Sequence, residues 1–131
     1  MADYPDNLLY TKEHEWLRLS DDKKTGTVGI TSFAVEQLGD VTMLELPDEG
    51  DSIEKDQVFG TVESVKAVSD VFAPVDGKVV RINSPLNDSP EYVNEAPYDE
   101  GWMVEIEITN ASQLDGLMKV EAYRAFVAEQ E

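Results

Sequence analysis

Residues 59–74 read Phe-Gly-Thr-Val-Glu-Ser-Val-Lys-Ala-Val-Ser-Asp-Val-Phe-Ala-Pro, with Lys66 at the middle of the stretch. Runs rich in β-branched and aromatic residues, 58–62 and 68–72, stand on either side of the lysine. Such runs predict two strands joined by a tight turn. We therefore expect Lys66 at the tip of a hairpin, clear of the body of the fold. Most lysines in such turns are only solvated, so the residues around Lys66 must carry any functional interpretation.

Short alternating stretches of the same kind continue on both sides of this hairpin. They lie at residues 16–19, 27–30, 41–46, 77–82 and 102–108. The apolar face of the last stretch consists of Trp102, Val104, Ile106 and Ile108. Glu105 and Glu107 take its opposite face, as a half-buried strand requires. The pattern predicts a mainly β chain, a flattened antiparallel barrel-sandwich hybrid.

Two segments are expected to be helical. Thr31 or Ser32 is a possible cap for a short helix over 33–38, and Gly39 can end it in a left-handed conformation. A C-terminal helical segment is expected over about residues 111–130, where Asn110 and Gln113 resemble a capping box. Its apolar residues recur at helical spacing, which indicates core packing: Val120, Tyr123, Phe126 and Val127.

The net charge and the absence of cysteine limit the classes of function that the chain could have. The 131 residues suit one domain spanning 1–131, and the net charge of −18 disfavours nucleic acid and anionic membranes as partners. Such a charge suits binding to a partner protein with a basic docking face, or simply keeps the chain soluble.

There is no cysteine, so any sulfur redox chemistry requires an added group. No membrane-span or signal pattern occurs in the sequence. We expect a bacterial cytoplasmic protein, or a mitochondrial matrix protein if a presequence has been removed.

The run from Glu63 to Asp70 resembles the modified-lysine motif of the biotinyl and lipoyl carrier family, specifically that of glycine cleavage H proteins. Its residues around the lysine are Glu63, Ser64, Val65 and Ala67. Biotin carriers usually have Met on both sides of the lysine. Lipoyl domains of 2-oxo acid dehydrogenases usually have Asp before it. Val65 and Ala67 depart from the biotin-carrier pattern, and Val65 departs from the lipoyl-domain pattern too.

The resemblance extends over nearly the whole chain. Further matching segments follow in the family's order: Tyr10–Trp16, Val28–Thr31, Leu38–Asp40, Leu46-Pro47 with Gly50, Val93-Asn94, Pro97-Tyr98, Glu100–Met103 and Glu121–Tyr123. One departure is Asp99, where the family often has Gly, and it calls the shape of that turn into question.

The resemblance implies a non-catalytic carrier in which (R)-lipoate is attached to Lys66 and supplies the missing sulfur. A lipoate ligase or a lipoyl/octanoyl transferase would load it. A pyridoxal phosphate glycine decarboxylase would then place the aminomethyl group of glycine on the arm, and an aminomethyltransferase would pass its carbon to tetrahydrofolate. A flavin (FAD) dihydrolipoyl dehydrogenase would reoxidise the arm. Tethering keeps the intermediate at high local concentration.

The resemblance further suggests that the loaded arm folds back into a cleft on the carrier. Glu15 and Asp70 are candidates for stabilising its positive amine there, although both could be plain surface acids. Glu63 and Asp70 also make a Schiff-base lysine implausible, since nearby carboxylates favour the charged amine. A single histidine, His14, makes no convincing metal site, and we expect it to pack or hydrogen-bond beside Trp16.

Two alternatives stay open. The chain could be an H-like lipoyl relay or storage protein that donates lipoate to other enzymes, or an unmodified binding module. A reconstituted glycine cleavage assay separates the carrier from the relay, and the presence of any modification separates both from the binding module.

Overall fold

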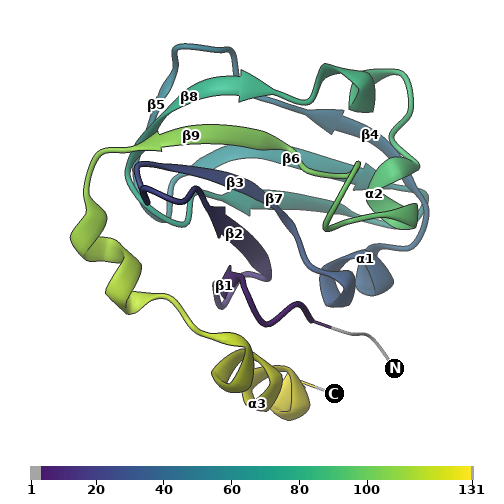
Figure 1. The fold of residues 1–131 in the computed structure, drawn as a ribbon. Helices are drawn as coiled ribbons and strands as arrows, with labels where there is room; N and C mark the ends of the chain where they lie inside the picture. The colour runs from purple at the N-terminus through teal and green to yellow at the C-terminus, as the bar shows by residue number, and fades with distance from the viewer. Residues whose placement is uncertain (1–3, 131) are drawn as a thin grey trace.

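Two antiparallel sheets face each other in the computed structural model, which describes residues 4–130 (Figure 1). The larger sheet has six strands, in the spatial order β1 (Leu9–Tyr10), β2 (Glu15–Leu19), β3 (Thr25–Ile30), β9 (Val104–Ile108), β8 (Gly77–Ile82) and β5 (Ser52–Ile53). The smaller sheet has three, in the order β4 (Val41–Glu45), β6 (Val58–Ser64) and β7 (Val68–Phe72). Within residues 4–130 the strands form no closed barrel, and the mainly β antiparallel class predicted from the sequence is confirmed.

All seven stretches predicted as strands contain one. The two strands that the alternation did not reveal, β1 and β5, are two residues long, too short for a period to show. One detail of the prediction is wrong. Trp102 lies before β9 rather than in it, and the neighbouring Met103 is the residue that is fully buried in the core.

The short helix forms as predicted, as α1 (Ser32–Leu38). Thr31 caps it, because its hydroxyl accepts a hydrogen bond from the Ala34 amide at 3.3 Å. Gly39 ends it with φ +77° and ψ −153°, so φ is positive but ψ lies outside the left-handed helical region. That combination is essentially restricted to glycine. The sequence analysis did not predict η1 (Ser84–Asn87) or α2 (Tyr92–Glu95).

The C-terminal segment is two helices rather than one. A 3-10 helix, η2 (Ala111–Gly116), comes first, and α3 (Val120–Gln130) follows. The predicted capping box is wrong, because Asn110 makes no side-chain cap bond and Gln113 accepts a hydrogen bond from the Asp76 amide at 2.6 Å instead. The predicted core face of α3 is confirmed for Val120, Tyr123 and Val127, which are buried, while Phe126 is only partly buried.

The hydrophobic residues form two clusters. The first fills the space between the sheets, and its buried members lie between Leu17 and Ile106 in the chain. The second, the aromatic cluster, joins the N-terminal segment to α3, which lies apart from the two sheets (Figure 1). Its buried members are Tyr4, Leu8, Tyr10, Trp16, Phe33, Val120, Tyr123 and Val127.

His14 packs and hydrogen-bonds as predicted, against the aromatic cluster that also contains Trp16, but its ring contacts are with Tyr123, Phe33 and Phe126. Its Nδ1 is hydrogen-bonded to the Tyr123 hydroxyl at 2.8 Å, and its ring lies 4.5 Å from that of Phe33. The Tyr123 hydroxyl also bonds the Thr31 side chain at 2.7 Å. The C-terminal helix is thereby tied to the start of α1.

Gly29 provides a test of the packing beneath Trp16. A β-carbon there would lie 2.6 Å from Trp16 Cζ2. The ring is fully buried and its N–H donates to the carbonyls of Ile30 and Pro97, both at 3.0 Å, so it cannot move aside. We expect Gly29→Ala to lower the free energy of unfolding in urea by about 1–3 kcal/mol.

Gly116→Ala is the matched control, because the nearest atom to its new methyl group is the flexible Lys55 Nζ at 3.6 Å. Equal losses in the two variants would contradict the packing described for Trp16.

Candidate functional site

The hairpin that carries Lys66 is closed by Ser64. The Ser64 amide donates to the Ala67 carbonyl at 2.8 Å, which closes the turn at the end of β6 and β7. The Ser64 hydroxyl oxygen accepts from the amides of Lys66 at 3.3 Å and Ala67 at 3.0 Å. None of the turn residues has a positive φ, so the turn is not one of the primed types that require Gly or Asn. The turn is therefore stabilised by side-chain hydrogen bonds of Ser64 to the backbone, and it does not need a glycine with positive φ.

Lys66 itself is exposed, and Val65 beside it is 72% exposed. The only salt bridge within residues 4–130 joins Arg81 to Glu105, so the Lys66 amine forms none there. The stem of Lys66 lies over the end of α1, since a β-carbon at Gly39 would be 3.3 Å from Lys66 Cε. The adjacent Asp40 carbonyl accepts the Val65 amide at 3.2 Å. The backbone of the tip is held while its side chain stays accessible.

Glu15, the first arm-cleft candidate, is 1% exposed. Its Oε1 accepts the Thr11 hydroxyl at 2.5 Å and its Oε2 accepts the Phe72 amide at 3.1 Å. Burial raises the pKa of this carboxyl to about 7, and the two hydrogen bonds oppose that rise only in part. Near neutral pH the protonated and ionised forms of this carboxyl are therefore both populated.

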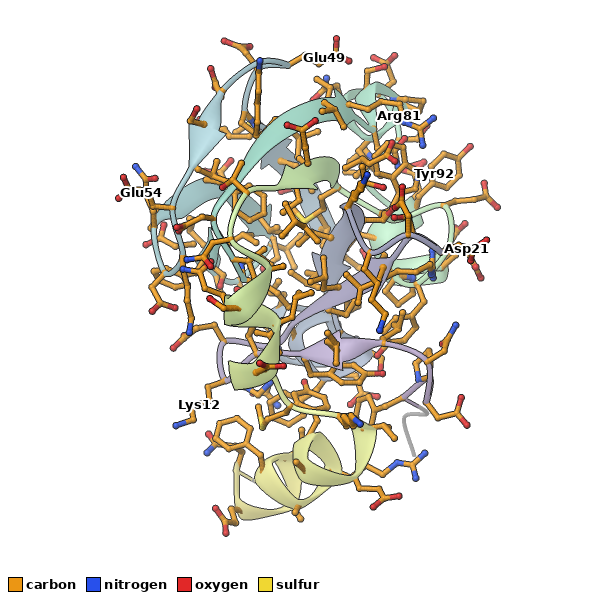
Figure 2. All side chains as sticks on the ribbon, turned by 60° about the vertical axis from the view of Figure 1, so that its left-hand side comes forward. Lys12, Asp21, Glu49, Glu54, Arg81 and Tyr92 are labelled. Atoms are coloured by element: carbon orange, nitrogen blue, oxygen red, sulfur yellow. The ribbon has the colours of Figure 1, made fainter. Side chains whose placement is uncertain are left out.

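A pocket of about 420 Å³ opens beside Glu15. Its lining mixes charges of both signs, from Lys12, Glu13, Lys55 and Asp56, with apolar side chains from Leu117 and Met118. Lys12 projects outward at the margin of the molecule (Figure 2). The volume falls within the range of small-ligand pockets. No group of three His, Asp or Glu side chains within residues 4–130 could hold a metal ion.

Asp70, the second arm-cleft candidate, is exposed on β7 and does not line this pocket. β7 is an edge strand. Ser64 and Ala67 form a hydrogen-bonded pair, so the alternation of an antiparallel ladder points the amides of Val68, Asp70 and Phe72 away from β6. Phe72 uses this free edge to reach Glu15. The edge thus runs from the lysine, past Asp70, to the buried carboxyl.

The comparisons with known proteins agree with one another. Residues 8–130 match the family described as Glycine cleavage H-protein. The chain is 54% identical over 127 residues to a glycine cleavage system H protein of Anaeromyxobacter sp. (strain K), covering 97% of this chain and 98% of that one. It is 48% identical over 130 residues to the one from Halalkalibacterium halodurans, covering 99% and 100%.

This chain belongs to the glycine cleavage H-protein family. A solved glycine cleavage system H protein from Mycobacterium marinum has the same fold, with a TM-score of 0.86 at 33% identity over 93% of this chain and 97% of that one. Within residues 4–130, no helix combines the length and the apolar character that crossing a bilayer requires.

The residues on which the family resemblance was based occupy defined places. Glu63 lies in β6 between two exposed apolar residues, Met43 of β4 and Val68 of β7. Val65 and Ala67 flank the lysine on the exposed turn. Asp99 has no positive φ, so the turn before Gly101 does not need the glycine that H proteins often have there.

Sequence reasoning missed the residues that surround Glu15 in space. Thr11 is close in sequence and could have been noticed as a hydroxyl donor four positions away. Lys55, Leu117 and Met118 come from distant turns, and no local pattern in this H-protein sequence marks them.

The raised pKa of Glu15 predicts how stability depends on pH. The folded state binds the proton more tightly than the unfolded state, so this group makes the free energy of unfolding fall as pH rises from about 4.5 through about 7. Glu15→Gln removes the effect. Between about pH 5.5 and 8.5 the variant should gain about 2 kcal/mol relative to wild type in urea unfolding.

Glu107→Gln is the control, because Glu107 is exposed on β9 and carries the same formal charge. A parallel pH dependence in wild type and Glu15→Gln would show that this carboxyl ionises normally.

Proposed function

We propose that this chain is the lipoyl carrier of a glycine cleavage system, modified on Lys66 and without catalytic activity of its own. The supporting observation is an exposed lysine at a hairpin tip whose backbone is fixed by Ser64 and Asp40. A modifying enzyme must enclose the lysine side chain, so exposure and a fixed turn are both required. Family membership makes lipoate the expected group.

When attached, (R)-lipoate supplies a cyclic disulfide that can accept an aminomethyl group and two electrons. The site fits that group, because the chain has no cysteine to compete with the disulfide and Lys66 lies at the free edge of β7. The chain positions the lipoyl arm, because Lys66 is its attachment point and the hairpin keeps that lysine clear of the sheets. A lipoate ligase or a lipoyl/octanoyl transferase would attach the group.

Three enzymes would use the loaded carrier in turn. They are a pyridoxal phosphate glycine decarboxylase, a tetrahydrofolate-dependent aminomethyltransferase and a FAD-containing dihydrolipoyl dehydrogenase. The net charge of −18 and the acids near the tip, Asp40, Glu63 and Asp70, suit partners with a basic docking face. All of these steps are chemistry of the partners.

The free edge of β7 provides a path for the arm to return to the carrier. It passes Asp70 and ends at Phe72, whose amide binds Glu15 beside the 420 Å³ pocket. A protonated aminomethyl amine placed there would meet the Glu15 carboxylate in a largely water-excluded setting, where charge-assisted hydrogen bonds are strong. Asp70 lies along this path and would attract the amine as it approaches.

Intact mass spectrometry tests the modification. After co-expression with a lipoate ligase and lipoate, wild type should carry one lipoyl increment and Lys66→Arg none, because arginine cannot form the amide. Lys78→Arg, on an exposed position of β8, should be modified as wild type is.

An increment that persists in Lys66→Arg would mean that another lysine is used. Absence of any increment in wild type would support an unmodified binding module. Modified wild type should then support glycine cleavage in a reconstituted assay, and failure there would favour the relay or storage protein.

A second experiment tests the pocket. Wild type loaded with the aminomethyl group, in the absence of aminomethyltransferase, should release ammonia more slowly than Glu15→Gln by roughly tenfold, the lower end of the range for one hydrogen bond to a charged group. Glu107→Gln should behave as wild type. Equal rates of release would show that Glu15 does not shield the arm.

A further inference from the structure

We propose that Asn94, on α2, is a positioning residue for the Lys66 hairpin; the functional part of this inference rests on the proposed function of Lys66. The side-chain amide of Asn94 contacts the chain between α1 and β4 through both of its polar atoms. Its Nδ2 donates to the Gly39 carbonyl at 2.8 Å, and its Oδ1 accepts the Val41 amide at 2.8 Å. It therefore brackets Asp40.

The bracketed segment is the one that holds the hairpin. The Asp40 carbonyl accepts the Val65 amide at 3.2 Å, and Val41 pairs in register with Ser64. Gly39 lies beneath the stem of Lys66. Asn94 bonds Gly39 and Val41, and each of the residues 39–41 faces one residue of the segment 64–66. The chain of contacts from Asn94 to the lysine has only two steps.

Asn94 is itself held by the core. Its neighbour Val93 is fully buried in the cluster between the sheets, and Gly101 packs so closely that a β-carbon there would lie 2.9 Å from Val93 Cα. The helices α1 and α2 both lie at the end of the sandwich where β6 turns into β7 (Figure 1). Because α2 is fixed by the core, it can restrain the exposed turn between β6 and β7.

The segment needs such restraint because its own backbone is irregular. Gly39 has a positive φ, and the pairing of β4 with β6 shifts between Val41 and Met43. An irregular edge of this kind is weakly defined by its ladder alone. A primary amide carries a donor and an acceptor on neighbouring atoms, so it can bind a carbonyl and an amide two residues apart at the same time. Aspartate retains the acceptor and loses the donor.

Residue-resolved amide hydrogen exchange on the full chain tests the positioning. In Asn94→Ala the Val65 amide should exchange about tenfold faster than in wild type, because the carbonyl that protects it is no longer fixed. Amides of β9 should be unchanged. Asn94→Asp should give a smaller acceleration, since it keeps the bond to the Val41 amide. Asn87→Ala, on η1, is the matched control and should exchange as wild type does.

Steady-state loading by a lipoate ligase tests the consequence. A displaced tip must be ordered on binding, so Asn94→Ala should raise the KM for the carrier by about fivefold and leave kcat near that of wild type. Asn94→Asp keeps the test valid if Asn94→Ala fails to fold.

If the Val65 amide exchanged at the wild-type rate in both Asn94→Ala and Asn94→Asp, the positioning role would be overturned. Faster exchange with an unchanged KM would overturn its role in loading. An unmodified wild type would refute the proposed function and leave the exchange result standing.

Discussion

An exposed side chain cannot be positioned by burial, and the structure meets this constraint at Lys66 through the backbone that carries it. The backbone of the tip is held instead, by the Ser64 hydroxyl from within the hairpin and by the Asp40 carbonyl from outside it. Both contacts leave the lysine exposed. The order of the tip therefore comes from the hairpin itself and from the segment between α1 and β4, which Asn94 of α2 holds in turn.

The second feature that the fold creates is an acid with an altered proton affinity. Glu15 is the first residue of β2, and His14 immediately before it has a positive φ. The carboxyl then lies between Thr11 and the free edge of β7, away from water. The same edge strand therefore connects the exposed lysine with a buried carboxyl, two environments that would otherwise lie on unrelated parts of the surface.

Sequence patterns predicted those parts of the molecule that are set by neighbours in the chain. Alternation revealed the longer strands, and Thr31 with Gly39 gave the limits of α1, because these signals act within one turn or one strand. The capping box at Asn110 failed because Gln113 bonds Asp76, a contact made by tertiary packing. Lys66 was identified through its local motif. The partners of Glu15 and the contacts of Asn94 were not, since they join segments up to 57 residues apart, as for Glu15 and Phe72.

The division of the hydrophobic residues into two clusters has a consequence for biosynthesis. The buried members of the sandwich core are complete once Ile106 has been made, whereas the aromatic cluster needs Tyr123 and Val127, near the end of the chain. The sandwich core contains no buried residue of α3, so the sheets and the lysine hairpin can form independently of that helix. The N-terminal aromatic residues are buried only together with that helix, so the aromatic cluster closes after Val127 has been made.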